Sequence, residues 1–252
     1  MRVEAPTFTD AAGNAGNDAR DVAAFNLEIE EAQRQLGIGA PRSAGGQGTQ
    51  VAETIFMGGA GDRGLYKQDM VRALNDAGVA NVRATDPPVT LGYGLLGDGI
   101  TVTQLNQDSG YLMMPNLVAA AGKKSADPNE QYNLIGYSYG AAVIAQHALY
   151  EADLRNKKVD NLVLIGAPIN QSLVDRLERS PNIGNVIYVT LDKHGDPIYP
   201  GMSDTEIIAS SPKLGYQMLF TGSGHFYYSQ ENAEGAKRRD ELARKLFESG
   251  VR

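Results

Sequence analysis

The sequence predicts an α/β fold in which a mostly parallel sheet is covered by helices on both faces. From residue 51 onward, short apolar runs rich in β-branched residues alternate with segments of helical periodicity. This alternation is typical of βαβ units, whose parallel strands need helices on both sides. A chain of 252 residues can bury the core of one such domain without a disulfide or a metal. We therefore expect one domain of about six strands over residues 51–252.

Each element of this domain is assigned from its pattern. Strands are expected at residues 51–57, 79–84, 132–136, 161–166, 185–191 and 215–221. Helices are expected at residues 65–77, 111–122, 139–153, 171–179, 203–209 and 230–248. The segment at 86–110 is long, rich in glycine and partly apolar, so it suits either a lid over a binding site or a surface excursion.

Residues 1–50 form a polar extension before the domain. Apolar residues at helical spacing predict one amphipathic helix that ends at Gly37. They are Val22, Phe25, Ile29, Ala32 and Leu36. The following segment, APRSAGGQGTQ, is typical of a linker. The extension either docks on the domain or belongs to a larger parent protein or secretion partner.

Composition limits the partners. The formal net charge of −7 disfavours nucleic acid, because phosphate binding needs a basic surface. The absence of cysteine excludes thiol nucleophiles and thiolate metal sites. The N-terminus has no apolar core of a secretory signal, and no segment approaches the ~20 apolar residues of a membrane span. We expect a soluble protein that is cytoplasmic or exported by a signal-independent route, and transient contact with a membrane surface stays open.

A candidate nucleophile, Ser138, lies in the pattern G-x-S-x-G, which covers residues 136–140. The pattern occurs by chance in about one chain in six of this composition, so its setting matters. Ser138 follows an expected strand and opens an apolar helix, and a turn this tight holds the serine in a strained conformation at the carboxyl edge of the sheet. The N–H of Tyr139, at the helix start, can donate to an oxyanion. An ordinary β–α turn is the alternative.

This motif and its setting resemble those of the α/β-hydrolase superfamily, over roughly residues 51–250. The similarity is to lipase- and esterase-like serine hydrolases. It implies the α/β-hydrolase fold, with oxyanion loop, serine, acid and histidine following one another in the chain.

The general base that a serine needs is sought among three histidines. His147 lies inside the helix after the elbow, which carries its side chain away from the active edge. His194 precedes the candidate acid, which is the wrong order for the family that the chain resembles. His225 lies in a loop rich in glycine and serine that can reach back to the elbow. We therefore expect His225 to be the base.

The acid is expected after the strand at 185–191, in the segment LDKHGDPIYPG. There, D-P-I-x-x-P resembles the D-P-V-P segment of lipases and cutinase-like enzymes, whose aspartate belongs to the triad. The resemblance favours Asp196, with Asp192 in reserve, as the group that fixes the histidine tautomer. Turn chemistry alone also accounts for Asp and Gly in such a loop.

The glycine-rich loop after the first strand, IFMGGAGDRG, completes the expected site. In the hydrolase interpretation, the N–H of Gly59 or Ala60 joins that of Tyr139 in an oxyanion hole, where small residues let the substrate approach. Met57 departs from the histidine often found at the matching position in lipases, which leaves the register of this donor open.

The same loop also fits a dinucleotide-binding oxidoreductase. Gly59, Gly61 and Gly64 form G-x-G-x-x-G between a strand and a helix, and Asp86 follows the next strand, where an acid would bond the ribose of NAD(P). This alternative leaves the serine elbow, the acid loop and the late histidine unexplained. The chain also has no Tyr-x-x-x-Lys pair of the short-chain dehydrogenases.

The resemblance implies a serine hydrolase that cleaves a lipid or small ester through an acyl-enzyme, without a metal or organic cofactor. The acid loop favours a lipase, phospholipase or carboxylesterase over a peptidase or thioesterase. A thioesterase or acyltransferase on the same fold and a non-catalytic binding module are further alternatives. The 86–110 segment, together with Met113, Met114 and the aromatic residues at 226–228, either lines an acyl-chain cleft or, in part, belongs to the core. The polar N-terminal region also resembles that of a module carried by a secretion apparatus, as in a bacterial lipase effector.

Overall fold

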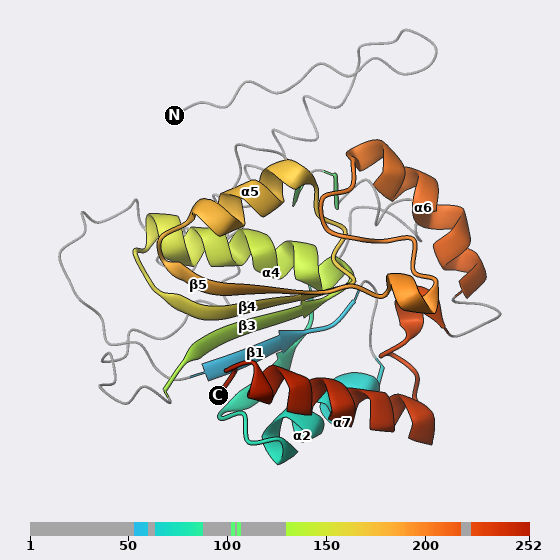
Figure 1. The fold of residues 1–252 in the computed structure, drawn as a ribbon, viewed down its shortest axis with the longest axis horizontal. Coiled ribbons are helices and arrows are strands. Elements are labelled where there is room, and N and C mark those ends of the chain that lie inside the picture. The colour runs from blue at the N-terminus through green and yellow to red at the C-terminus, as the bar shows by residue number, and fades with distance from the viewer. Residues whose placement is uncertain (1–52, 60–63, 88–101, 104, 107–129, 218–222) are drawn as a thin grey trace, which may run out of the picture. The chain divides into compact units, whose positions relative to one another are not determined.

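The computed structural model describes residues 53–59, 64–87, 102–103, 105–106, 130–217 and 223–252. Within them, five parallel strands form one sheet in the order β2-β1-β3-β4-β5 (Figure 1). The strands are β1 (Glu53–Met57), β2 (Val82–Thr85), β3 (Tyr132–Tyr137), β4 (Val159–Ile165) and β5 (Ile183–Val189). The expected N-terminal helix and linker, the helix at 111–122 and most of the 86–110 segment lie outside the described residues.

Helices cover both faces of the sheet, as predicted (Figure 1). On one face lie α4 (Tyr139–Leu149) and α5 (Gln171–Arg179), and on the other lie α2 (Tyr66–Asp76) and α7 (Ala233–Glu248). Successive strand residues alternate between the two layers, so that Leu134 packs with α4 and Ile135 packs with α2 and α7. Every residue of α4 is buried, which agrees with its apolar sequence.

The sixth strand, expected at 215–221, is wrong for residues 215–217. Helix α6 (Asp204–Tyr216) runs past Pro212 and includes Gly215 and Tyr216, and Gln217 follows as its C-cap. A capping box between Ser203 and Glu206 starts this helix. The run GYQMLFT is short and apolar, and such runs do not distinguish a strand from the end of a helix. Residues 218–222 lie outside the described part of the chain.

A ladder of polar side chains crosses the sheet and fixes its register. Asn133, Asn161 and Asn185 lie opposite one another on β3, β4 and β5, and Thr54 on β1 lies opposite Asn133. Each asparagine donates its side-chain N–H to the neighbouring strand on the β1 side of the sheet. The bonds run from Asn133 to Thr54 Oγ1 at 3.0 Å, from Asn161 to Asn133 Oδ1 at 2.8 Å and from Asn185 to Asn161 Oδ1 at 2.9 Å. A slip of one residue would break all three bonds, so the ladder selects this pairing.

The order of the strands in the sheet changes direction between β1 and β3. From β1 the chain first adds β2 on one side and then β3, β4 and β5 on the other. Helices therefore leave neighbouring strands in opposite directions at this point, which is where open α/β sheets bind ligands.

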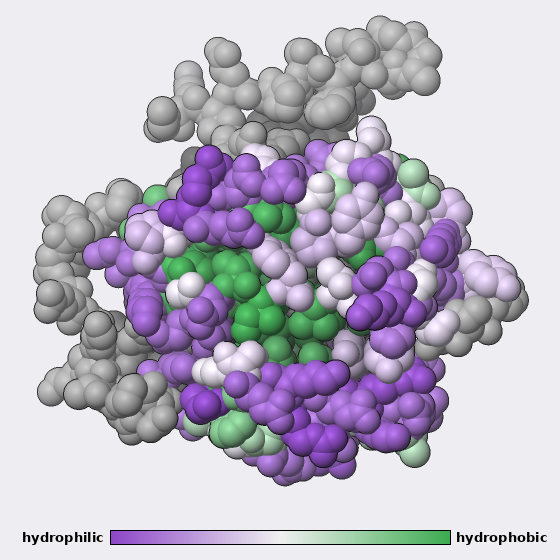
Figure 2. Space-filling view, in the orientation of Figure 1, coloured by the Kyte–Doolittle hydropathy of each residue, from purple (hydrophilic) through white to green (hydrophobic). Residues whose placement is uncertain are grey.

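The far edge of the sheet is formed by β5. Val186, Ile187 and Val189 are only partly buried there, and Figure 2 shows an apolar area between the polar surfaces of α5 and α7.

Among the described residues, none of the helices combines the length and the apolar character needed to cross a membrane.

Candidate active site

Ser138 occupies the sharp turn between β3 and α4. Its backbone has φ 57° and ψ −128°, a region that residues other than glycine adopt at a cost of about 1–3 kcal/mol. The Ser138 N–H donates to the carbonyl of Ile165 at the end of β4, at 2.8 Å. The strained turn expected for the elbow is therefore present, and the serine side chain is partly exposed.

The two glycines of the motif are required by close backbone packing. A Cβ on Gly136 would overlap Cα of Ala141, and a Cβ on Gly140 would overlap the carbonyl oxygen of Gly58. The helix after the serine can therefore lie directly against the ends of β1 and β3. This confirms that the flanking glycines make room for neighbouring backbone.

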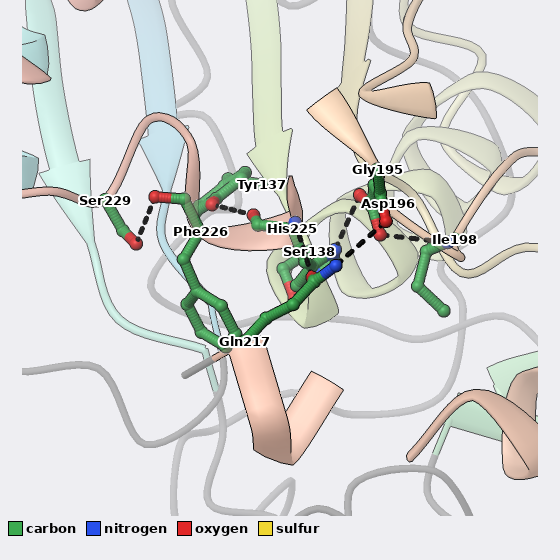
Figure 3. Close-up of polar contacts among 9 residues, drawn as sticks. All are labelled: Tyr137, Ser138, Gly195, Asp196, Ile198, Gln217, His225, Phe226 and Ser229. Atoms are coloured by element: carbon green, nitrogen blue, oxygen red, sulfur yellow. Dashed lines mark hydrogen bonds and ion pairs between the residues drawn. The ribbon is translucent and has the colours of Figure 1, made fainter. Parts of the chain in front are cut away.

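Ser138, His225 and Asp196 form one continuous chain of contacts (Figure 3). Ser138 Oγ lies 2.6 Å from Nε2 of His225, and Nδ1 of His225 lies 2.8 Å from Oδ2 of Asp196. An ionised carboxylate only accepts hydrogen bonds, so Nδ1 carries the proton. The lone pair of Nε2 then faces the serine hydroxyl, which is the arrangement that a general base needs.

The side chains of Asp196 and His225 are shielded from water, whereas Ser138 is partly exposed. The Asp196 side chain is fully buried and that of His225 is 5% exposed. The second carboxylate oxygen of Asp196 accepts the N–H of Ile198 at 2.9 Å. Both oxygens are thus satisfied, as a buried charge requires.

Two side chains not found by sequence reasoning hold the backbone of His225 (Figure 3). The Tyr137 hydroxyl donates to the His225 carbonyl, and the His225 N–H donates to Oε1 of Gln217 at 2.9 Å. Nε2 of Gln217 donates to the carbonyl of Gly195 at 2.8 Å. The motif singled out Tyr137 only as a spacer, and Gln217 lay in a predicted strand, so neither carried a signal.

Gly166, at the end of β4, leaves space for the acid and the base. It has φ +53°, and a Cβ there would lie 3.3 Å from Oδ2 of Asp196 and 3.4 Å from Cε1 of His225. Its position as the last residue of the strand predicted at 161–166, at the carboxyl edge of the sheet, was the signal that could have identified it.

The remaining candidates lie elsewhere. Asp192 is exposed and accepts a hydrogen bond from Thr190 at 2.8 Å, which lowers the pKa of its carboxyl. His194 stacks on Tyr227, with ring centroids 3.6 Å apart. His147 is buried in α4, with Nε2 3.8 Å from Glu151. Of the two acids that the sequence offered, the structure brings Asp196 to His225.

Gly59, after the end of β1, lies directly beside Ser138. A Cβ on Gly59 would lie 3.4 Å from Cβ and 3.7 Å from Oγ of Ser138. The Gly59 N–H donates to the Tyr66 hydroxyl at 3.1 Å, so an oxyanion would have to replace that partner. Tyr139 is the first residue of α4, and Ala60 lies outside the described residues.

Two of the groups that would bind a dinucleotide, the Asp86 carboxylate and the Gly59 N–H, already contact other residues of the protein. Asp86 forms an ion pair with Lys67, whose side chain is 9% exposed. The Gly59 N–H is bonded as described above, and Gly61 lies outside the described residues. Within the described ranges, no three His, Asp or Glu side chains gather closely enough to hold a metal ion.

The aromatic residues expected to line a cleft divide into two groups. Phe226 lies edge-on to the His225 ring, with centroids 5.6 Å apart. Tyr227 and Tyr228 pack against the core layer of α2 and α7, and burial raises the pKa of Tyr228 to about 12. Phe226 alone therefore contacts the site, and Met113 and Met114 fall outside the described residues.

Comparison of the chain with models of known protein families gives no match, and neither does comparison with curated protein sequences.

Proposed function

We propose that this protein is a serine hydrolase that cleaves carboxylic esters through an acyl-enzyme on Ser138. The observation that carries the proposal is the pair of contacts made by His225, at 2.6 Å to Ser138 Oγ and 2.8 Å to Asp196 Oδ2. In this order, the imidazole can take the proton of the hydroxyl, and the buried carboxylate can orient the imidazole and stabilise its charged form.

In the first step, Ser138 Oγ bonds to the ester carbonyl carbon while Nε2 of His225 takes the hydroxyl proton. The carbonyl π electrons move to oxygen and form a tetrahedral oxyanion. Asp196 stabilises the imidazolium without taking its proton. When the carbonyl re-forms, the bond to the leaving alcohol breaks, and the alcohol takes the proton from His225.

The oxyanion needs donors placed beside Ser138. The N-terminal N–H of α4 at Tyr139 and the loop at Gly59 and Ala60 are the groups we assign to this role. Gly59 supports the assignment by its close approach to the serine side chain. Each such donor contributes about 10²–10³-fold in rate.

In the second step, water replaces the alcohol. His225 takes a proton as the water oxygen attacks the acyl carbon, and Ser138 Oγ then leaves as a hydroxyl with that proton. The products are a carboxylic acid and free enzyme.

We further propose that the chain belongs to the α/β-hydrolase superfamily. The parallel sheet, the strained serine turn and the chain order Ser138, Asp196, His225 support membership. A sixth strand and an N-terminal helical extension belong to the same proposal.

The preferred substrate class is a lipid or an uncharged ester, as for a lipase, phospholipase or carboxylesterase. Support comes from the lipase-like acid loop and from three exposed apolar side chains in the segment that joins Asp196 to Gln217. They are Tyr199, Ile208 and Tyr216, which are 42%, 40% and 59% exposed. A role as a secreted antibacterial lipase module is the narrower form of this proposal.

Hydrolysis of p-nitrophenyl esters of increasing chain length, beside phosphatidylcholine vesicles, tests the function. We expect turnover by the wild type and none above background by Ser138→Ala with an unchanged circular dichroism spectrum. Equal turnover by the two proteins refutes the assignment. Quenching of nicotinamide fluorescence by the wild type would instead favour the dinucleotide alternative.

A further inference from the structure

Gln217 joins the loop that carries the acid to the loop that carries the base. Its Oε1 accepts the N–H of His225 at 2.9 Å, and its Nε2 donates to the carbonyl of Gly195 at 2.8 Å (Figure 3). Gly195 directly precedes Asp196. Gln217 is 6% exposed, and its side-chain amide therefore spans, inside the protein, the two segments whose side chains must meet.

Little regular structure holds His225 in place. It lies in a single 3-10 turn, η4 (Gly224–Phe226). In and after this turn the N–H groups of Phe226, Tyr227 and Ser229 donate to the carbonyls of Ser223, Gly224 and Phe226, at 3.2, 3.1 and 3.2 Å. The amide and carbonyl of His225 itself are bonded to the side chains of Gln217 and Tyr137. The position of the imidazole thus depends on side-chain contacts.

The amide of Gln217 suits this place chemically. A carboxamide presents one acceptor and one donor group at its tip, and here each meets its complement. Gly224 packs tightly against it, since a Cβ at that position, with φ +63°, would overlap Nε2 of Gln217. The side chain is therefore confined to the orientation that satisfies both loops.

We propose that Gln217 is a positioning residue that sets the separation of Asp196 and His225. The expected effect of Gln217 on the reaction rate rests on the proposed function. Its expected effect on the hydrogen bond between Asp196 and His225 rests on the geometry alone. A displacement of about 1 Å at a reacting group costs about 100-fold in rate.

Two variants of Gln217 test the proposal, with a matched control. Gln217→Met removes both hydrogen-bonding groups, and Gln217→Glu keeps the acceptor for His225 but loses the donor to Gly195. The control is Gln146→Met. Gln146, in α4, is also buried, and its side chain also donates to a backbone carbonyl, that of Leu105.

The first readout is the second-order rate constant for labelling by a fluorophosphonate. We expect a fall of about 100-fold for Gln217→Met and about tenfold for Gln217→Glu, with Gln146→Met within twofold of the wild type. The second readout is the low-field proton resonance of the bond between His225 Nδ1 and Asp196. We expect it to be lost or shifted in both Gln217 variants and retained in the control.

The outcomes separate this inference from the proposed function. A wild type that reacts with the probe, together with a Gln217→Met variant that reacts equally fast and keeps the resonance, overturns the positioning role. A wild type that does not react contradicts the proposed function, and the resonance alone then decides the positioning role. If Gln217→Met does not fold, Gln217→Glu, which has the same shape as the native side chain, decides it in the same way.

Discussion

The carboxylate of Asp196 is divided between two partners, with Oδ2 at 2.8 Å from Nδ1 of His225 and Oδ1 at 2.9 Å from the N–H of Ile198. The side chain has no exposed surface. Asp192, four residues earlier in the same loop, is exposed and bonded to Thr190. The two acids therefore give a matched pair of variants.

Replacing Asp196 by asparagine is expected to lower kcat about 10⁴-fold, because the amide favours the wrong histidine tautomer and no longer stabilises the imidazolium. Asp192→Asn should leave kcat within twofold of the wild type. Steady-state ester hydrolysis measures both. Comparable losses in the two variants would contradict the assignment of Asp196.

A methyl group at Gly140 is expected to destabilise the whole molecule. The added Cβ would overlap the carbonyl oxygen of Gly58, and overpacking of this kind costs about 1–3 kcal/mol or more. Gly250→Ala is the control for an added methyl group without overlap, because a Cβ at Gly250 would meet nothing within 4 Å and its φ of +104° adds backbone strain alone. Urea unfolding should show a clearly larger loss of unfolding free energy for Gly140→Ala than for the control, and the reverse order would be inconsistent with the close packing described.

The asparagine ladder predicts that replacing a central asparagine lowers the unfolding free energy more than replacing the one on the edge strand. Asn161 is 1% exposed and bonds to Asn133, Asn185 and Gln131, so Asn161→Ala should lower the unfolding free energy by about 3 kcal/mol. Asn185, on the exposed edge strand, makes the last bond of the ladder, and Asn185→Ala should cost about 1 kcal/mol. Equal losses in urea unfolding would contradict a contribution that depends on the number of bonds each asparagine makes.

Arg239 holds the segment that follows His225. Its guanidinium donates to the carbonyls of Tyr228 and Gln230, at 2.8 and 2.7 Å, and to Asp69 Oδ2 at 2.9 Å. Arg239→Lys keeps the charge but cannot reach three acceptors in a fork geometry, so we expect a loss of about 2 kcal/mol in unfolding free energy. Arg238→Lys, on the same helix, should cost less than 1 kcal/mol, because Arg238 makes longer bonds, at 3.4 Å. A smaller loss at Arg239 than at Arg238 in urea unfolding contradicts this role.

Local patterns were sufficient to predict the sheet and the elbow. The five described strands coincide with predicted ones to within a few residues, because buried parallel strands are short apolar runs. The strained Ser138 turn followed from G-x-S-x-G between a strand and a helix. The choice of His225 and Asp196 depended instead on a resemblance, and the structure shows that these two side chains and Ser138 meet.

Contacts between distant segments could not be predicted from one sequence. Gln217 lay in a run whose composition suits a strand, whereas the capping box at Ser203 starts a helix that continues to Tyr216. The hydroxyl of Tyr137 contacts His225 across 88 positions of the chain. Pairing at that range is decided by tertiary packing, which leaves no periodic signal in the sequence.

Mapping of the adduct formed with a fluorophosphonate tests the central claim most directly. Peptide mass spectrometry of the wild-type protein should find one phosphonyl group per chain, attached to Ser138, and no adduct in Ser138→Ala. Under the same conditions, His225→Ala should react far more slowly than the wild type. A protein that stays unmodified, or an adduct on a different residue, would contradict the account.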